Sequence, residues 1–489
     1  MPAIMFQGTG SNVGKSMLVA GFCRHLKRQG YKVAPFKPQN MSNNAAVTPD
    51  GGEIGRAQAL QALACGLEPS VHMNPVLLKP QSNVGSQVVV QGKVVGQMQA
   101  RNYSQSKHSL LESVMQSYQI LSDSADFVVV EGAGSASEVN LRQGDIANMG
   151  FAEAARLPVI LIGDIDRGGV IASLVGTQQL LLHSDKELVK GYVINKFRGD
   201  ASLFTSGLEI ITNQTGWPGF GILPWFDDAV RLPAEDSEDL GRDVASAHSG
   251  KALKVAVPVL PRIANFDDLD ALKSESGVSL TMVRRGETIP LDSDLVILPG
   301  SKSTIGDLEA MKSEGWEVDI KAIVRRGGFV LGLCGGYQML GKRIMDPEGV
   351  ETEKGAVCEG LGLLDIETVM AGEKRTVQVS GAHVESGSPM HGYEIHVGRS
   401  DGPDRARPIF TIEGKQEGAT SPDGRVMGSY IHGLFNDDQF RAAFLKSLGH
   451  AASGKSYQHG VETTLDALAD HFAQHMDVDG LIKVAERGL

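Results

Sequence analysis

Two separate parts of this sequence contain residues that could carry out chemistry. Near the start, a glycine-rich run ends in Gly-Lys-Ser and follows a short apolar segment. At a helix N-terminus, the backbone N–H groups of such a loop wrap phosphates, and the helix dipole favours negative charge. We therefore predict an ATP-binding loop in which Lys15 reaches the β- and γ-phosphates and the Ser16 hydroxyl binds Mg²⁺. The loop comprises Gly8, Thr9, Gly10, Ser11, Asn12, Val13, Gly14, Lys15 and Ser16.

The spacing of this loop departs from the common Gly-x-x-x-x-Gly-Lys-Ser/Thr pattern. Counting back from Gly14, the expected glycine position holds Thr9, and Gly8 stands one place earlier. An extra residue does not change what the backbone N–H groups do. The alternative interpretation is a glycine-rich turn with an incidental lysine. The strand-like run before the loop and the helical pattern after it favour the phosphate site.

Polar side chains at the ends of other predicted strands extend this site. Glu131 follows the apolar run 127–130, at the sheet edge where ligands of open α/β sheets bind, so we expect it to be a second Mg²⁺ ligand. The alternative for Glu131 is a solvated loop carboxylate. Glu53 is a weaker candidate for another metal ligand. Asn195 and Lys196 end the run 191–194, from which an asparagine amide could read a purine edge and so help to bind ATP.

The second chemical signature is Cys334, which lies between glycines after the apolar run 328–331. A strand, a sharp glycine-flanked turn and a helix form a nucleophile elbow, where a helix N-terminus favours the reactive thiolate. Such a thiol needs a base, and we expect His432 to be that base. The N–H groups of Gly335 and of the Gly300 loop are candidate oxyanion donors. The alternative is that Cys334 is a small buried hydrophobe, as we expect for the other cysteines.

Composition limits the class of protein. At 489 residues the chain exceeds the ~250–300 residues at which one core stops growing, so two or more domains are expected. A net charge of −12 argues against nucleic acid or an anionic membrane as the main partner. No apolar stretch approaches the ~20 residues that span a bilayer, and the first strand leaves no room for a signal peptide. Four cysteines form no disulfide framework, so we expect a cytoplasmic protein.

Strand-like apolar runs alternate with helical patterns in both halves. Such runs suit strands that helices cover on both faces, so we predict a two-domain α/β protein with mostly parallel sheets. We expect a nucleotide-binding domain over 1–232, a polar linker over 233–251 and a second α/β domain over 252–450. The segment 451–489 is predicted to be helical and to pack on the second domain. The predicted strands are 2–7, 32–36, 127–130, 158–162, 191–194, 254–259, 295–298 and 328–331, and 17–29 is a predicted helix.

The N-terminal half resembles dethiobiotin synthetase and its relatives. The shared features are the loop with its extra residue, Lys37-Pro38 after the second strand, and Glu131 followed by Gly-Ala-Gly. This resemblance implies a P-loop domain that uses ATP to activate a carboxylate as an acyl phosphate.

The C-terminal half is similar to the triad (class I) glutamine amidotransferases, which implies that Cys334 and His432 release ammonia from glutamine. That family usually has His-x-Glu, whereas here Gly433 and Leu434 follow the histidine. Asp437, Asp438 or a backbone carbonyl could replace the missing glutamate.

Together the two halves resemble the corrinoid amidases over essentially the whole chain. The resemblance implies ATP-, Mg²⁺- and glutamine-dependent amidation of a corrinoid, without a tightly bound prosthetic group. The closest similarity is to the members that amidate the b, d, e and g carboxylates of adenosylcobyrinic acid a,c-diamide. Members that make the a,c-diamide itself are one alternative, and a nucleotide-gated binding or partitioning protein is another. Formation of a homo-oligomer is left open. The supporting runs are 37–44, 52–58, 163–169, 195–200 and 392–398.

Overall fold

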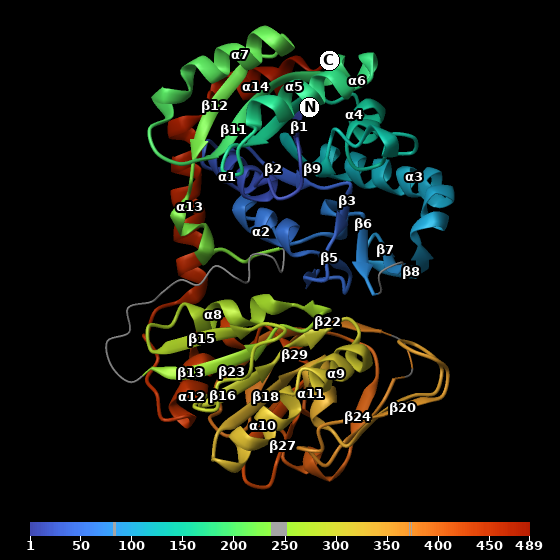
Figure 1. Ribbon diagram of the computed structural model, residues 1–489, viewed down its shortest axis with the longest axis vertical. Helices are drawn as coiled ribbons and strands as arrows, with labels where there is room; N and C mark the ends of the chain where they lie inside the picture. Colours follow the sequence, from blue (N-terminus) through green and yellow to red (C-terminus); the bar gives the residue numbers. More distant parts are fainter. Residues whose placement is uncertain (82–84, 236–251, 371, 373) are drawn as a thin grey trace. The chain divides into compact units, whose positions relative to one another are not determined.

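A computed structural model describes residues 1–81, 85–235, 252–370, 372 and 374–489 (Figure 1). The chain divides into two compact units, and each unit combines segments that are separated in the sequence. Most of the predicted linker, residues 236–251, lies outside the described residues. Unit 1 comprises Met1–Ser42, Gly52–Leu232 and Val461–Leu489, and unit 2 comprises Asn43–Gly51 and Pro233–Gly460.

Unit 1 is built on a six-stranded sheet in the order β12-β11-β10-β1-β9-β2, and every neighbouring pair is parallel. The central strands β1 and β10 are buried along their length, as their continuous apolar runs require. This confirms the predicted parallel α/β fold. The strands are β1 (Ala3–Gly8), β2 (Val33–Phe36), β9 (Phe127–Ser135), β10 (Val159–Asp164), β11 (Val189–Phe197) and β12 (Gly219–Pro224).

Helices flank this sheet, and a smaller sheet in the order β3-β6-β7-β8 lies in the same unit (Figure 1). The small sheet contains β3 (Gln39–Met41), β6 (Val76–Pro80), β7 (Gly85–Val90) and β8 (Lys93–Gln99). The helices are α1 (Lys15–Arg28), α2 (Arg56–Cys65), α3 (Ala100–Ser124), α4 (Met149–Ala155), α5 (Val170–Leu180), α6 (His183–Leu188), α7 (Thr205–Thr215), α13 (Tyr457–His475) and α14 (Val478–Arg487).

The C-terminal segment is helical from Tyr457 onwards, and its residues up to Gly460 belong to unit 2, but our prediction that the whole segment packs on the second domain is wrong. Residues from Val461 onwards belong to unit 1, where the Phe472 ring packs on Phe22 of α1 with centroids 5.3 Å apart. The buried Arg24 guanidinium bonds Glu462 at 2.6 Å and Asp466 at 2.7 Å. The amphipathic pattern shows that α13 needs an apolar partner, and α1 is that partner.

Unit 2 contains a second six-stranded sheet in the order β15-β13-β16-β18-β28-β27, parallel except for the last pair. Its strands are β13 (Leu253–Pro258), β15 (Val278–Val283), β16 (Leu295–Leu298), β18 (Phe329–Leu333), β27 (Ala419–Thr420) and β28 (Val426–Ser429). Its helices are α8 (Asp270–Lys273), α9 (Thr304–Ser313), α10 (Trp316–Arg325), α11 (Gly335–Leu340) and α12 (Asp438–Ser447).

Two further sheets extend unit 2, and their strands pair antiparallel except for β19 with β21. One sheet has the order β20-β19-β21-β24 and another the order β26-β25-β22-β23-β29. The bounds are β19 (Arg343–Asp346), β20 (Ala356–Glu359), β21 (Glu367–Val369), β22 (Arg375–His383), β23 (Pro389–His396), β24 (Arg399–Asp401), β25 (Phe410–Ile412), β26 (Lys415–Glu417) and β29 (Ile431–His432).

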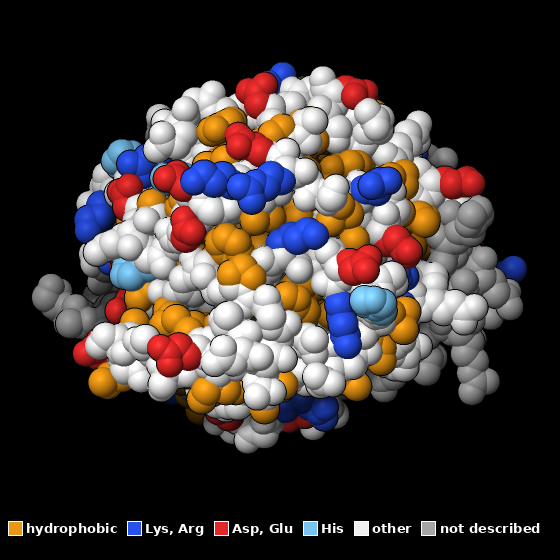
Figure 2. Space-filling view, turned by 90° about the horizontal axis from the view of Figure 1, so that it is seen from above, with side chains coloured by type: hydrophobic (Ala, Val, Ile, Leu, Met, Phe, Trp, Pro, Cys, Tyr) orange, Lys and Arg blue, Asp and Glu red, His pale blue; other side chains and the backbone are white. Residues whose placement is uncertain are grey.

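Figure 2 shows acidic and basic side chains interspersed with hydrophobic ones on one face of the molecule. None of the described helices is both long enough and apolar enough to cross a membrane.

Candidate functional site

The predicted phosphate loop connects β1 to the N-terminus of α1. Gly14 caps that helix with a φ of 88°, in the left-handed region that glycine adopts without strain. The Lys15 ammonium, on the first residue of the helix, donates to the carbonyl oxygens of Gly134 at 2.9 Å and Gly10 at 3.4 Å. The loop therefore holds a cation where strand, loop and helix meet, as the binding of phosphate requires.

Glu131 is the centre of a buried polar network beside this loop. Its Oε1 atom accepts hydrogen bonds from Ser16 Oγ and Lys37 Nζ, both at 2.8 Å, and its Oε2 atom accepts one from Gln61 Nε2 at 2.6 Å. Burial by itself would raise the pKa of Glu131, but Lys37, Gln61 and Lys15 outweigh that effect and lower it. The carboxylate thus stays ionised, directly against the Ser16 hydroxyl.

The structure joins the two predicted metal ligands Ser16 and Glu131, but it pairs Glu53 differently. Glu53 Oε2 accepts a hydrogen bond from Lys79 Nζ at 2.8 Å, and both side chains are buried. In the described part of the chain, no group of three or more His, Cys, Asp or Glu residues could hold a metal ion by itself. The metal-ligand role of Glu53 stays a prediction, and it has to compete with this ion pair.

The asparagine–lysine pair at the end of β11 braces the phosphate loop. Asn195 Nδ2 donates to the Val13 carbonyl oxygen at 2.8 Å, while its Oδ1 atom accepts from the Lys196 N–H at 2.9 Å. The Lys196 ammonium bonds the Asn12 carbonyl and pairs with Asp164 at 2.9 Å. These bonds occupy both ends of the Asn195 amide, the group that we expected to read a purine edge.

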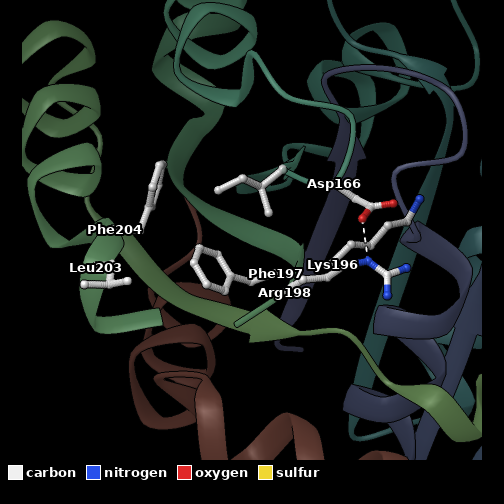
Figure 3. Close-up of a pocket in the computed structure, with 7 residues that line it drawn as sticks. Asp166, Lys196, Phe197, Arg198, Leu203 and Phe204 are labelled. Carbon is white, nitrogen blue, oxygen red and sulfur yellow. Dashed lines mark hydrogen bonds and ion pairs between the residues drawn. The ribbon is translucent and has the colours of Figure 1, made fainter. Parts of the chain in front are cut away.

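A cavity of about 430 Å³ lies next to Lys196. Figure 3 shows the Phe197 and Phe204 rings toward one side of it and the polar ends of Asp166, Lys196 and Arg198 toward the other. Arg198 Nε bonds Asp166 Oδ1 at 2.6 Å. The cavity thus has aromatic side chains on one wall. It lies beside the phosphate loop, because Lys196 contacts both the cavity and the loop.

Cys334 lies at a sharp turn between β18 and α11. Its backbone has a φ of 53° and a ψ of −107°, a combination that costs a residue other than glycine about 1–3 kcal/mol. A side chain at Gly332 would come within 2.6 Å of the Gly336 carbonyl oxygen, and one at Gly336 would collide with the Leu298 backbone. These are the strain and crowding of the nucleophile elbow that the glycines predicted.

His432 contacts Cys334 on one side and a carboxylate on the other. His432 Nδ1 lies 2.7 Å from Asp268 Oδ2, and Asp268 Oδ1 accepts from the Gly433 N–H at 2.6 Å. Burial by itself would lower the pKa of His432, but Asp268 and the Cys334 sulfur raise it to about 10. The imidazole is therefore protonated at neutral pH, the state that favours a neighbouring thiolate.

The carboxylate at His432 corrects our expectation that Asp437 or Asp438 might replace the missing glutamate. Asp437 caps α12 through the N–H groups of Gln439 and Phe440, and Asp438 bonds Arg441 at 2.9 Å. Asp268 precedes His432 by 164 positions, so the spacing after the histidine cannot reveal it. The available signal was the run 265–270, whose several carboxylates follow a buried strand.

The two predicted oxyanion residues lie at the same place. A Cβ atom on Gly335 would be 3.0 Å from the Ser301 backbone nitrogen, and one on Gly300 would be 3.0 Å from His432 Cε1. The loop after β16 therefore faces both the start of α11 and the imidazole. The structure thus brings Gly300 and Gly335 next to each other and to the histidine, and their role as oxyanion donors stays a prediction.

Comparisons with known proteins cover both halves of the chain. A model described as "CobQ/CobB/MinD/ParA nucleotide binding domain" matches residues 4–240, and one described as "CobB/CobQ-like glutamine amidotransferase domain" matches residues 254–440. The cobyric acid synthase of Cereibacter sphaeroides is 59% identical over 485 residues, 99% of this chain and 100% of the relative. That of Rhodobacter capsulatus is 60% identical over 485 residues, with the same shares.

The cobyric acid synthase of Brucella suis is 58% identical over 483 residues, which are 99% of each chain. The matches therefore extend over nearly the full length of all three relatives. They confirm the predicted resemblance to the corrinoid amidases. The chain belongs to the cobyric acid synthase family.

Proposed function

We propose that this chain is a cobyric acid synthase, an ATP- and glutamine-dependent amidoligase of cobalamin biosynthesis. Its acceptor would be adenosylcobyrinic acid a,c-diamide, amidated at the b, d, e and g carboxylates. The observation that carries the proposal is the buried Cys334–His432–Asp268 arrangement in a chain that also has a phosphate loop. Identity of 59% over the full length of a relative supports the choice of substrate.

In the glutaminase half-reaction, the Cys334 sulfur attacks the carboxamide carbon of glutamine. The N–H of Gly335 and the Gly300 loop would stabilise the oxyanion. His432 gives its proton to the departing ammonia, and Asp268 holds the imidazole in position. Water then cleaves the thioester to release glutamate, with His432 as general base.

In the synthetase half-reaction, a corrinoid carboxylate attacks the γ-phosphorus of ATP, which gives an acyl phosphate and ADP. Ammonia attacks the acyl carbon and phosphate leaves, so an amide replaces the carboxylate. Lys15 and the loop N–H groups hold the phosphates during this transfer. Because each step is a polar substitution, no prosthetic group is needed.

Ser16 and Glu131 fit a magnesium site. A hydroxyl and an ionised carboxylate 2.8 Å apart are hard oxygen donors, and Mg²⁺ usually takes one or two protein oxygens together with phosphates and water. When bound there, Mg²⁺ neutralises charge on the phosphates. We place the nucleobase in the cavity lined by Phe197 and Phe204, since Lys196 links that cavity to the loop. We further propose that the enzyme works in the cytoplasm.

A matched pair of variants tests this division of labour. Cys334→Ala should abolish amidation driven by glutamine and leave amidation driven by ammonium salts, because only the first needs a thiol. Lys15→Ala should abolish both. The measurement is amide formation on purified adenosylcobyrinic acid a,c-diamide, followed by mass spectrometry. Loss of the ammonium-driven reaction in folded Cys334→Ala would contradict the proposal.

The acceptor assay also separates the alternatives. Cobyrinic acid as the amidated substrate would identify an a,c-diamide synthase. ATP hydrolysis without any corrinoid- or glutamine-dependent product would instead favour a nucleotide-gated partitioning protein. The buried Cys334–His432 pair argues against the latter, since such a protein needs no nucleophile.

A further inference from the structure

A short segment of the N-terminal half belongs to the glutaminase unit. Residues Asn43–Gly51, here called the strap, are grouped with unit 2, although the chain on both sides of them is in unit 1. The strap contains β4 (Ala45–Val47), whose three residues are buried. It begins two residues after β3 of the small sheet in unit 1 ends.

The strap bonds directly to the loop that carries Asp268. The Phe266 N–H donates to Asn44 Oδ1 at 3.0 Å, and Asn44 Nδ2 donates to the Ala234 carbonyl oxygen at 3.1 Å. The Ala45 N–H donates to Asn265 Oδ1 at 3.4 Å. Asn44 is almost completely buried, so these bonds form in a water-poor setting where a lost partner is costly.

Asn265 links the strap to a second neighbour of the catalytic histidine, Tyr393. Its Nδ2 atom donates to the Tyr393 hydroxyl at 3.2 Å, and the Tyr393 ring stacks on His432 with centroids 5.3 Å apart. Asn265 has a φ of 53°, the left-handed conformation that asparagine tolerates better than most residues. It also caps the short helix Phe266–Leu269, which contains Asp268.

Two groups thus orient the imidazole of His432. They are the Asp268 carboxylate and the Tyr393 ring, and both are connected to the strap by side-chain amides. We propose that Asn44 and Asn265 are positioning residues for the Asp268–His432 pair, so that a segment from the nucleotide-binding half completes the glutaminase. This inference rests on the proposed glutaminase function. It adds that the glutaminase loses efficiency when the strap is disturbed.

The test uses the full-length chain with Asn44→Ala and, separately, Asn265→Gly. Glycine keeps the left-handed backbone at 265, so the second variant removes the amide bridge while preserving the loop conformation. We expect kcat for glutamine hydrolysis to fall about 10- to 100-fold in each, since small misplacement of catalytic groups costs up to about that factor. KM for glutamine should change little, and ammonium-driven amidation should remain at the wild-type rate.

Asn43→Ala is the matched control, because the Asn43 side-chain oxygen accepts no hydrogen bond. A second measurement is the pH dependence of Cys334 alkylation by iodoacetamide, read on the isolated peptide. A disturbed imidazole should shift this profile in Asn44→Ala and Asn265→Gly but not in Asn43→Ala. A role confined to folding would lower the melting temperature without shifting the profile.

The outcomes separate this inference from the function on which it rests. If Cys334→Ala retains glutamine hydrolysis, the proposed function is wrong. If Cys334→Ala abolishes it while Asn44→Ala and Asn265→Gly keep wild-type kcat and alkylation profiles, the function stands and the strap proposal is wrong.

Discussion

The two candidate sites differ in what completes their charged groups. At the glutaminase site, the imidazole of His432 and the carboxylate of Asp268 are buried and bond each other at 2.7 Å. At the phosphate loop, the Lys15 ammonium donates to the backbone carbonyls of Gly134 and Gly10. A neutral carbonyl is a weaker partner for an ammonium than a phosphate is. The charged pair of the glutaminase site is formed by two side chains of the protein, whereas at the phosphate loop Lys15 also acts on the Glu131 carboxylate and lowers its pKa. A bound phosphate would give Lys15 a stronger partner than the two carbonyls.

The largest expected effect comes from removing the carboxylate beside the loop. Glu131→Gln should abolish both glutamine-driven and ammonium-driven amidation, because the neutral amide cannot hold Mg²⁺ next to Ser16. Glu131→Asp should keep the charge and require more Mg²⁺. The measurement is a Mg²⁺ titration of corrinoid-stimulated ATP hydrolysis, with circular dichroism to verify folding.

The control for that prediction is Glu138→Gln, which changes an exposed carboxylate in the same region. An unchanged Mg²⁺ dependence in folded Glu131→Gln would show that the loop does not need its carboxylate to complete the site. The difference drawn above between the charged groups of the phosphate loop and those of the glutaminase site would then no longer hold.

The second effect is on pH dependence. Asp268→Asn should reduce glutamine hydrolysis about 10²-fold or more, because the imidazole loses both its orientation and its stabilising charge. Asp268 helps to raise the pKa of His432 to about 10, so its loss should move the alkaline limb of kcat/KM to lower pH. Ammonium-driven amidation should be unaffected.

The same pair has a consequence for stability. Folding raises the pKa of His432 from 6.5 to about 10. The contribution of His432 to the free energy of unfolding is therefore complete below pH 6.5 and is lost as the pH rises through about 10. Asp438→Asn is the control, since Asp438 bonds Arg441. Equal pH profiles for Asp268→Asn and the wild type would contradict the assignment of the carboxylate.

The smallest effect on reaction rates is expected from a substitution in the C-terminal helix α13. Phe472→Ala should lower the free energy of unfolding of unit 1 by about 3–5 kcal/mol, because the ring is fully buried against Phe22. At low temperature both activities should persist. On heating, ammonium-driven amidation should be lost before glutamine hydrolysis, since α1 carries Lys15 and Ser16.

Heat inactivation of the two activities, followed in parallel, measures this difference. Gln474→Ala changes an exposed side chain of the same helix and should leave both inactivation curves unchanged. Earlier loss of glutamine hydrolysis in Phe472→Ala would mean that the helix supports the other unit.

The features that sequence could reveal are those encoded over short distances. The eight predicted strands all belong to the two main sheets and lie within about five residues of their predicted bounds, because a continuous apolar run favours a strand that is buried on both faces. The strands β12, β15, β27 and β28 of these sheets were not predicted. The phosphate loop and the elbow at Cys334 are also contiguous. Asp268 was missed because contact between residues 164 positions apart leaves no spacing to read.

The C-terminal helix was misplaced for a related reason. Periodicity shows that α13 has an apolar face and does not show which apolar face it meets. The buried bonds of Arg24 to Glu462 and Asp466 decide this choice, and their partners are more than 400 positions apart. The strap was missed in the same way, since its bonds join Asn44 and Ala45 to residues 222 and 220 positions away.

The chain passes between its two units four times, after Ser42, Gly51, Leu232 and Gly460. A fragment that stops at Leu232 therefore lacks the helix packed on α1, and the complementary fragment lacks the asparagine bonded to the Asp268 loop. No single cut yields both units whole. The unit that releases ammonia and the unit that uses it therefore each depend on a segment from the other side of the boundary at Leu232. Splitting the gene at that boundary would damage both units.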